Sequence, residues 1–393
     1  MTQQKKYGNF KDVAIKTWNS IKEAITIEEI KNLANPISYP KQQKILQSRL
    51  SSSIISSDRQ QDIYYQKITN LARKMRDYHN WIKSIIIYTY CTPFKEYKNS
   101  KEHRTSILDI GCGQGGDILK WYHAKVSEYV GIDTDYYGIY SSTNGALSRY
   151  NEFKRKFPNF GKVTWIQADG SALLNSVNQK AKIPTMSQEN KELIDKTFNK
   201  KKFDIFSAQF SIHYLFDTKE SINNLIENIK NHLKLGGFII LTLFDAKQVM
   251  EKLGDKDTFT SYYTDDDGNR KKFFEIIKKF DGKNIDKEGQ AIDVHISWIM
   301  EENKYITEYL VSETLLTKTM EKAGCRIVDT DLFSNLFFLN QPYFTNVIQH
   351  EENPKNYKFY KNVAEYYGDL KGVDKESKLF TFLNRYYIFQ KIN

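Results

Sequence analysis

The residues best suited to chemistry follow one short apolar run. Residues 107–117 begin with apolar side chains and one acid, a pattern typical of a central strand in a parallel sheet, and then become rich in glycine. Apolar residues return from Ile118 onward, where a helix is predicted to begin. A strand, a glycine turn and a helix can bind a nucleotide, because glycine lets the backbone approach a ligand closely and adopt φ values closed to other residues.

Two acids sharpen this interpretation. Asp133 ends a second predicted strand, about 20 residues after Gly111, where a carboxylate can accept hydrogen bonds from both ribose hydroxyls of an adenosine. Asp117 lies in the glycine turn itself. An acid there suits a cation better than a diphosphate. S-adenosylmethionine carries an adenosine, a sulfonium and an amino group, so it fits this pattern better than NAD does.

Length and composition limit the possible domain number, partners and cellular compartment. The 393 residues are enough for one large α/β domain with additions, or for two domains. A formal net charge of +10 favours a polyanionic partner such as RNA, although a solvated lysine-rich surface is the plainer alternative. Cys91, Cys112 and Cys325 are few and widely spaced, which indicates a reducing compartment and no zinc site. We see no signal peptide and no apolar run that could span a bilayer.

The first half of the chain is predicted to hold the elements that position these acids. Residues 1–60 are polar and form an arm or linker, and residues 61–393 form the main domain. A long helix from Asp62, with Ile63 and Ile85 on its apolar stripe, carries Asn80 and Lys83 on one side. Further elements are expected as follows: a helix over 139–153, a strand over 162–168 ending at Asp169 and Gly170, a surface insertion over 175–202, and a strand over 203–210 that runs into His213 and Tyr214.

The second half is predicted to complete the sheet. A helix over 221–233 ends at Gly236 and Gly237, and a buried strand covers 238–243. An irregular, charged module is expected at about 247–303, with a hairpin turn at Asp265. Glu308 lies in a short strand before a helix over 312–323. The last two strands cover 326–330 and 386–390, with an aromatic, Asn-rich loop between them.

Several separated stretches resemble the eukaryotic and viral mRNA cap guanine-N7 methyltransferases. Gly-Gly-Asp at 115–117 and Gln-Phe-x-x-His-Tyr at 209–214 are specific when they occur together. The stretch at Arg149 and the Thr-Glu-Tyr element at 307–309 resemble the capping enzymes of large DNA viruses, in several of which the methyltransferase is the C-terminal part of a longer chain. The other matching stretches are Asn80-Trp-Ile-Lys83, Gly131-Ile-Asp133, Ala168-Asp169 and Leu235-Gly-Gly-Phe238.

The resemblance implies the fold and the roles of individual residues. It implies an α/β, Rossmann-like class I S-adenosylmethionine-dependent methyltransferase: a seven-stranded, mostly parallel sheet with helices on both faces, an N-terminal helical extension and an inserted module. The cofactor would be S-adenosylmethionine, with S-adenosylhomocysteine as product, and it would be held by Lys83, Gly111, Gly113, Asp117, Asp133, Asp169, Gly170 and Gln209. The guanine cap would be held by Asn80, Phe210, His213, Tyr214, Glu308 and Tyr386.

The implied reaction is methyl transfer to N7 of the guanine cap of mRNA. N7 already carries a lone pair and the sulfonium carbon is already activated, so positioning suffices and we expect no catalytic acid or base and no metal. Two residues depart from the family pattern: Gln114 stands where many members have lysine, and Phe244 replaces a common proline.

The resemblance also implies partners and a location. The expected partners are the capped 5′ end of mRNA, and either triphosphatase and guanylyltransferase domains of the same polypeptide or a stimulatory subunit, with no membrane. The location would be the cytoplasm, in a viral factory or virion, for a viral protein and the nucleus for a cellular one. The alternatives are a methyltransferase for another small molecule, protein or RNA, a non-catalytic scaffold that binds RNA or protein, and an NAD enzyme, which Asp117 disfavours.

Overall fold

The computed structural model describes most of the chain after residue 70. The described residues are 26–35, 38, 42, 71–96, 105–158, 161–265, 267–368 and 370–393. The chain divides into two compact units, Met1–Asp62 and Ile63–Asn393. In the first unit, helix α2 (Ile27–Ala34) begins with a capping box made by Thr26 and Glu29. Most of the predicted polar arm and the predicted start of the long helix lie outside the described residues.

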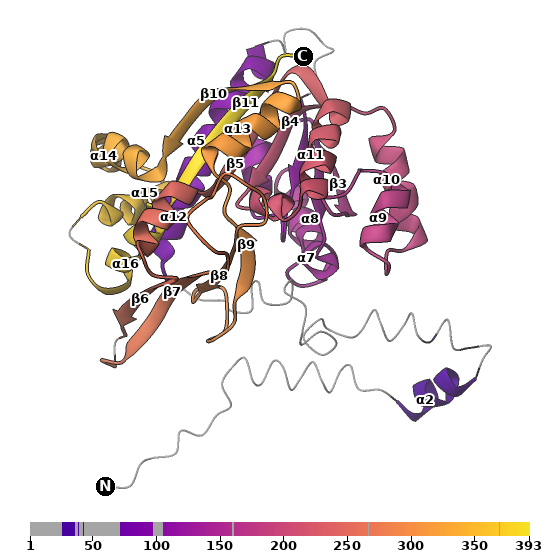
Figure 1. The fold of residues 1–393 in the computed structure, drawn as a ribbon, viewed down its shortest axis with the longest axis horizontal. Coiled ribbons are helices and arrows are strands. Elements are labelled where there is room, and N and C mark those ends of the chain that lie inside the picture. Colours follow the sequence, from indigo (N-terminus) through magenta and orange to yellow (C-terminus); the bar gives the residue numbers. More distant parts are fainter. Residues whose placement is uncertain are drawn as a thin grey trace. The chain divides into compact units, whose positions relative to one another are not determined.

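A seven-stranded sheet organises the second unit (Figure 1). Its strand order is β10-β11-β5-β4-β1-β2-β3. The neighbours among β1 to β5 are parallel, and β11 runs antiparallel to both β5 and β10. The strands are β1 (Ser106–Ile110), β2 (Glu128–Asp133), β3 (Lys162–Gln167), β4 (Phe203–Gln209), β5 (Leu233–Phe244), β10 (Cys325–Leu332) and β11 (Asn384–Lys391). The predicted mostly parallel, seven-stranded sheet is therefore confirmed.

Helices cover both faces of this sheet, because successive buried strand residues face opposite sides, as Ile107 and Leu108 do. One face shares a hydrophobic core with α5 (Arg73–Glu96), α6 (Ile118–His123), α7 (Tyr136–Tyr140), α8 (Ala146–Lys156) and α12 (Ala246–Leu253). The other shares a core with α10 (Gln188–Phe198), α11 (Lys219–His232) and α13 (Glu313–Lys322). The strand order reverses between β1 and β4, and open α/β sheets bind ligands at the carboxyl ends of the strands beside such a switch.

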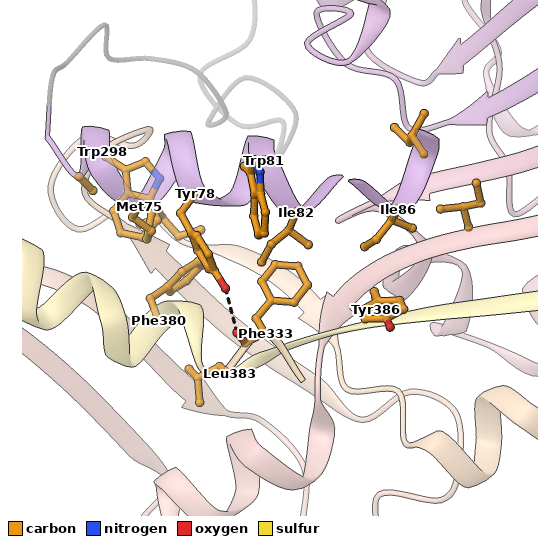
Figure 2. Packing of buried hydrophobic residues seen from close by; sticks show 14 of the residues in the cluster. Met75, Tyr78, Trp81, Ile82, Ile86, Trp298, Phe333, Phe380, Leu383 and Tyr386 are labelled. Atoms are coloured by element: carbon orange, nitrogen blue, oxygen red, sulfur yellow. Dashed lines mark hydrogen bonds between the residues drawn. The ribbon is translucent and has the colours of Figure 1, made fainter. Parts of the chain in front are cut away.

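Helix α5 presents a stripe of large side chains to the core (Figure 2). Met75, Tyr78, Ile82 and Ile86 recur at helical spacing and are buried. The Tyr78 hydroxyl donates to the backbone oxygen of Phe333 at 3.2 Å, which ties α5 to the segment after β10. Ile85, which was predicted on the same stripe, is 40% exposed, because it lies one position away from the buried face.

A second, four-stranded antiparallel sheet takes three of its strands from the predicted irregular module and the fourth from the short strand predicted around Glu308. Its strand order follows the chain: β6 (Thr258–Thr264), β7 (Arg270–Lys278), β8 (Ala291–Ile296) and β9 (Ile306–Tyr309). The predicted hairpin turn is confirmed, since Asp265 N donates to Asn269 O at 2.9 Å and Gly268 has φ +83°. The prediction of irregular structure was wrong, because short apolar runs at Phe273 and Ile292 are buried at the centre of regular strands.

Four other predictions need correction. The segment between β10 and β11 is not a loop but three helices, α14 (Phe333–His350), α15 (Pro354–Tyr366) and α16 (Gly372–Thr381). The segment predicted as a surface insertion forms α9 (Ser176–Lys182) and α10. The single helix predicted over 139–153 is interrupted, because Gly145 is the N-cap of α8 and a Cβ there would lie 2.6 Å from the backbone of Ser141. Gly236 and Gly237 lie inside β5 rather than ending a helix.

Candidate functional site

The glycine loop after β1 touches the loop after β4. Gly111, Gly113 and Gly115 all have positive φ, at +70°, +49° and +67°, as a tight turn that favours glycine requires. A Cβ at Gly111 would lie 2.4 Å from the Cβ of Ser211, so only glycine fits there. The Ser211 hydroxyl donates to the backbone oxygen of Ile110 at 2.6 Å. The loops at the switch point of the sheet are therefore fixed against each other.

Asp133 joins the end of β2 to this glycine loop. One of its carboxylate oxygens accepts from Gly113 N at 2.7 Å, and the other accepts from Asp135 N at 2.9 Å. Burial raises the pKa of Asp133 to about 6, although the backbone donors of Asp135 and Gly113 act in the opposite direction. Each carboxylate oxygen has further lone pairs, so Asp133 can still accept from the two hydroxyls of a ribose.

Asp117 is already paired with two lysines. Its carboxylate lies 2.8 Å from Lys83 Nζ of α5 and 2.5 Å from Lys120 Nζ of α6. Burial alone would raise the pKa of Asp117, but Lys83 and Lys120 hold it well below its usual range. Asp117 was expected to bind a cationic part of the ligand, but in the structure two lysines already neutralise it. An ammonium and a carboxylate side by side complement the carboxylate and amino group of an amino acid, which S-adenosylmethionine also carries.

Lys120 connects the two predicted groups of residues, and the sequence analysis missed it. Its ammonium also donates to Asn80 Oδ1 at 2.9 Å, so it bridges a predicted cap residue and a predicted cofactor residue. Lys120 is only 8% exposed, and this burial lowers its pKa while Asp117 opposes the shift. The one signal in the sequence is its i,i+3 spacing from Asp117 at the start of α6, which many surface pairs share.

The loop after β3 is held by a helix that was predicted as a surface insertion. Gln179 of α9 is fully buried, and its amide exchanges hydrogen bonds of 2.7 and 2.8 Å with the backbone of Asp169. The Asp169 carboxylate accepts from Ser171 N at 2.8 Å. A Cβ at Gly170 would lie 2.7 Å from the side chain of Ile110, so this loop closes onto the end of β1. Gln179 therefore positions the loop that carries Asp169.

The side chains of Gln209 and Phe210, at the end of β4, contact different elements. The Gln209 amide is bound to the β5 backbone at Ile240 and to Thr242, which fixes its orientation. Phe210 has φ +57°, a conformation that large side chains rarely adopt. Its ring stacks on His79 of α5 at 5.8 Å, and Lys83 Nζ lies 5.9 Å from its centroid. Phe210 is therefore placed beside the lysine that binds Asp117.

A second cluster lies where the two sheets meet. Strand β9 packs against the short helix η3 (Ile212–Phe216), which follows β4. Glu308 of β9 is 4% exposed, and its carboxylate lies 3.5 Å from both His213 Nε2 and the Tyr214 hydroxyl. Burial lowers the pKa of His213, and Glu308 only partly offsets it, so the imidazole is neutral near pH 7. Neither buried ring nitrogen of His213 has a hydrogen-bond partner in the described part of the chain.

Tyr386 is not brought to this cluster. Its hydroxyl donates to Asp329 of β10 at 3.0 Å, and it lines a pocket with residues of α5 and α14. None of the other predicted cap residues lines that pocket. The role of Tyr386 at the cap remains a prediction, and this contact does not support it.

The donors and acceptors at this edge of the sheet fit S-adenosylmethionine. Asp117, Asp133 and Asp169 follow three neighbouring strands, where the ligands of open α/β sheets lie. They offer acceptors for the amino group of an amino acid, for the ribose hydroxyls and for an adenine amino group. Among the described residues no group of three or more side chains is arranged to hold a metal ion. No helix in that part of the chain is long and apolar enough to cross a membrane.

Comparison with known proteins agrees with this geometry. Residues 52–392 match the model of the mRNA (guanine-N(7))-methyltransferase domain. The "Probable mRNA-capping enzyme" of Acanthamoeba polyphaga mimivirus is 35% identical over 398 residues, which cover 98% of this chain and 33% of that protein. The mRNA cap guanine-N(7) methyltransferase of Schizosaccharomyces pombe is 28% identical over 46% of this chain and 41% of its own length.

Among solved structures, an S-adenosylmethionine-dependent methyltransferase from Clostridium acetobutylicum ATCC 824 is similar over 77% of this chain and 91% of its own, at 15% identity and a TM-score of 0.41. Of the two relatives described above, the chain spans about a third of the mimivirus protein and less than half of the Schizosaccharomyces pombe protein. On the match of the family model, the chain belongs to the mRNA (guanine-N(7))-methyltransferase family.

Proposed function

We propose that this chain transfers the methyl group of S-adenosylmethionine to N7 of the guanine cap of mRNA, converting GpppN-RNA to m7GpppN-RNA. The observation that carries the proposal is the convergence of His213, Tyr214 and Glu308 beside the loops that carry the three acids. The cofactor acids alone would suit many methyltransferases. The buried cluster adds the acceptors and donors that a guanine needs.

Guanine can be recognised at this cluster by its edge. Its N1 and 2-amino groups are donors, and a carboxylate at Glu308 would accept from both. Adenine lacks both donors, and leaving a buried carboxylate without them would cost about 1–3 kcal/mol. The unbonded nitrogens of neutral His213 offer one donor and one acceptor to the same ligand. The cluster therefore favours guanine over adenine.

The residues act by positioning. Bound S-adenosylmethionine supplies an activated methyl group, and N7 of guanine is itself the nucleophile. We infer that Lys83, Asp117, Asp133 and Asp169 orient the donor while Asn80 and Glu308 orient the acceptor. Alignment of this kind converts a bimolecular displacement into an effectively unimolecular one. Positive charge moves onto guanine during transfer, so the Glu308 carboxylate also favours the product-like transition state.

The proposal is tested by methyl transfer to a defined acceptor. We expect the purified chain to methylate GpppA at N7 and to leave ApppA unmodified, with the position of the methyl group read by nuclease digestion and mass spectrometry. Equal methylation of ApppA, or transfer only to an internal RNA base, would contradict it. A non-catalytic scaffold would bind capped RNA without turnover.

The partners are also part of the proposal. We infer that the capped 5′ end of mRNA is the substrate and that the basic surplus binds its phosphates. Affinity for capped RNA should then fall steeply as salt rises, while a cap dinucleotide should respond much less. If the affinity for capped RNA did not change with salt, the surplus positive charge would be a solvated surface that does not bind RNA.

The other capping steps would come from triphosphatase and guanylyltransferase domains of the same polypeptide, or a stimulatory subunit would assist. For a viral protein the site of action would be the cytoplasm, and for a cellular one the nucleus. Imaging of the tagged protein in the source cells tests the location, and activity of the purified chain alone tests the need for a subunit.

A further inference from the structure

A pocket of about 230 Å³ lies between α5, α14 and the β10-β11 edge of the main sheet, and its lining includes Tyr386 but no predicted cofactor-binding residue. Its lining includes Trp81, Ile82 and Ile86 of α5, and Tyr386 of β11, which Figure 2 shows along one side of that helix. The volume is below the range of about 300–1,000 Å³ typical of drug-sized ligands, so the pocket suits a compact molecule.

One carboxylate lines this pocket, together with the polar side chains of Thr89 and Asn340. Asp329 of β10 lines it and accepts hydrogen bonds from two tyrosine hydroxyls, Tyr90 at 2.5 Å and Tyr386 at 3.0 Å. No lysine, arginine or histidine in the described ranges lies within 4.0 Å of the Asp329 carboxylate. A carboxylate beside apolar surface is normally paired with a cation, because removing a lone charge from water is costly.

The aromatic walls are held in place by rings outside the pocket. Trp81 packs edge-on against Phe344 at 4.6 Å and stacks with Tyr343 at 6.1 Å. Tyr90 packs edge-on against Phe238 at 5.4 Å. Burial and the nearby Asp329 charge raise the pKa of both pocket tyrosines, so they remain protonated donors at physiological pH. The pocket is therefore built before any ligand arrives, which reduces the ordering cost of binding.

We propose that this pocket binds a small organic cation, held by the Asp329 carboxylate and by contact with the rings of Trp81, Tyr90 and Tyr386. Alkylated ammonium groups and flat methylated bases share the required chemistry, since both spread positive charge over apolar surface and are recognised by aromatic side chains with an acid. Leu336 and Leu339 of α14 supply the apolar remainder of the site. The inference does not depend on the proposed methyl transfer.

The test compares each cation with a neutral partner of the same shape. Calorimetry on the full chain would measure choline against 3,3-dimethylbutan-1-ol, and 7-methylguanosine against guanosine. We expect at least one cation to bind about tenfold more tightly than its neutral partner. Preference for choline identifies an alkylammonium ligand, and preference for 7-methylguanosine identifies a flat base. Equal affinity within both pairs, or no binding of either cation at millimolar concentration, would overturn the proposal.

Variants of the chain show whether cation binding depends on the pocket itself. Asp329→Asn should reduce affinity for the bound cation about tenfold, while Asp331→Asn, the same charge change on the same strand outside the pocket, should not. Asp329→Asn also removes a charged acceptor from two tyrosines, so it could lower affinity by disturbing their positions. Thr89→Lys is a second test that leaves Asp329 and both tyrosines in place. Thr89 is exposed at the pocket lining, and a lysine there would offer Asp329 an internal cation. Cation binding that survives Thr89→Lys, or is lost equally in Asp331→Asn, would overturn the proposal.

Discussion

The loops proposed to bind S-adenosylmethionine and the cluster proposed to bind guanine differ in the hydrogen bonding of their polar groups. Around Asp117 and Asp133, two lysines, Asn80 and the glycine-loop backbone form hydrogen bonds of 2.5–3.0 Å. Around Glu308 the contacts to His213 and Tyr214 are 3.5 Å, and both His213 nitrogens lack partners within the described residues. We therefore expect the first region to be prepared before its ligand arrives, while the ring nitrogens of His213 in the second region still have hydrogen-bonding capacity for a ligand. Changes in the two regions should therefore have different consequences.

The largest effect is expected from Glu308→Gln. The change keeps the shape, removes the charge and turns one acceptor into a donor. That donor would face the guanine's own donors, and such a mismatch costs about 1–3 kcal/mol in a buried site. Loss of the charge that favours the cationic product adds to this. We expect kcat/KM for capped substrate to fall by about one to three orders of magnitude, while S-adenosylmethionine affinity stays within about twofold. Steady-state kinetics and calorimetry measure the two effects.

Inosine-capped substrate sharpens the same comparison, because it lacks the 2-amino group. It should be a poor substrate for the wild type and should lose less when Glu308 is changed. Near-normal activity of Glu308→Gln on the guanosine cap would remove Glu308 from the guanine site.

The next largest effect is expected from Asp133→Ala on the cofactor side. It removes two ribose hydrogen bonds to a charged acceptor, each worth about 1.5–3 kcal/mol, so S-adenosylmethionine affinity should weaken at least about tenfold. Asp255→Ala, at an exposed pair with Lys283, is the control and should leave affinity unchanged. Unchanged affinity in a folded Asp133→Ala variant would mean that the adenosine lies elsewhere.

A pH titration probes the same carboxylate without mutation. Burial raises the pKa of Asp133 to about 6, so below that pH the free protein holds the acid protonated and it accepts ribose donors poorly. We expect S-adenosylmethionine affinity to be constant above pH 6 and to fall up to about tenfold per unit below it. Asp133→Asn should flatten this dependence. A profile that stays unchanged in Asp133→Asn would assign the titration to another group.

The smallest effect is expected from Lys120→Met, which tests whether the two regions are linked. Asp117 keeps Lys83, so the loss should be about 1 kcal/mol, or about fivefold in cofactor affinity. The KM for cap should rise as well, because Asn80 loses its donor. Lys156→Met removes an exposed i,i+4 pair with Glu152 and should change neither. A rise in cap KM without any cofactor effect would show that Lys120 serves only Asn80.

The sequence predicted the central sheet well because its strands are short apolar runs with acids and glycines at their ends. It predicted the segment after β10 badly. Phe333, Phe337 and Phe344 are buried at helical spacing, but the surrounding asparagines favoured a loop. Packing against α5 and α15 overrides those local preferences. Propensity read from one segment cannot include contacts made by another.

The candidate site also contains residues that the sequence predicts and residues that it does not. The acids at strand ends were predictable, because the carboxyl edge of a parallel sheet gathers them. Lys120 and Gln179 were not, because their importance lies in burial and in partners from distant segments: Asn80 for Lys120 and Asp169 for Gln179. The family resemblance implies a C-terminal tyrosine, for which Tyr386 was chosen over Tyr387, and the Tyr386 hydroxyl donates to Asp329. Side-chain direction depends on register with neighbouring strands, which one strand alone does not reveal.

Glu308 reaches the site on a sheet of its own, and this separation affects how such a protein can evolve. The loops that carry Asp117, Asp133 and Asp169 belong to the main sheet, while β9 belongs to the antiparallel one. Under the role proposed for Glu308, mutations in the β6-β9 sheet would change which base is accepted without disturbing the residues proposed to bind the methyl donor. A lineage could explore new acceptors through one module while ancestral donor chemistry persisted in the other.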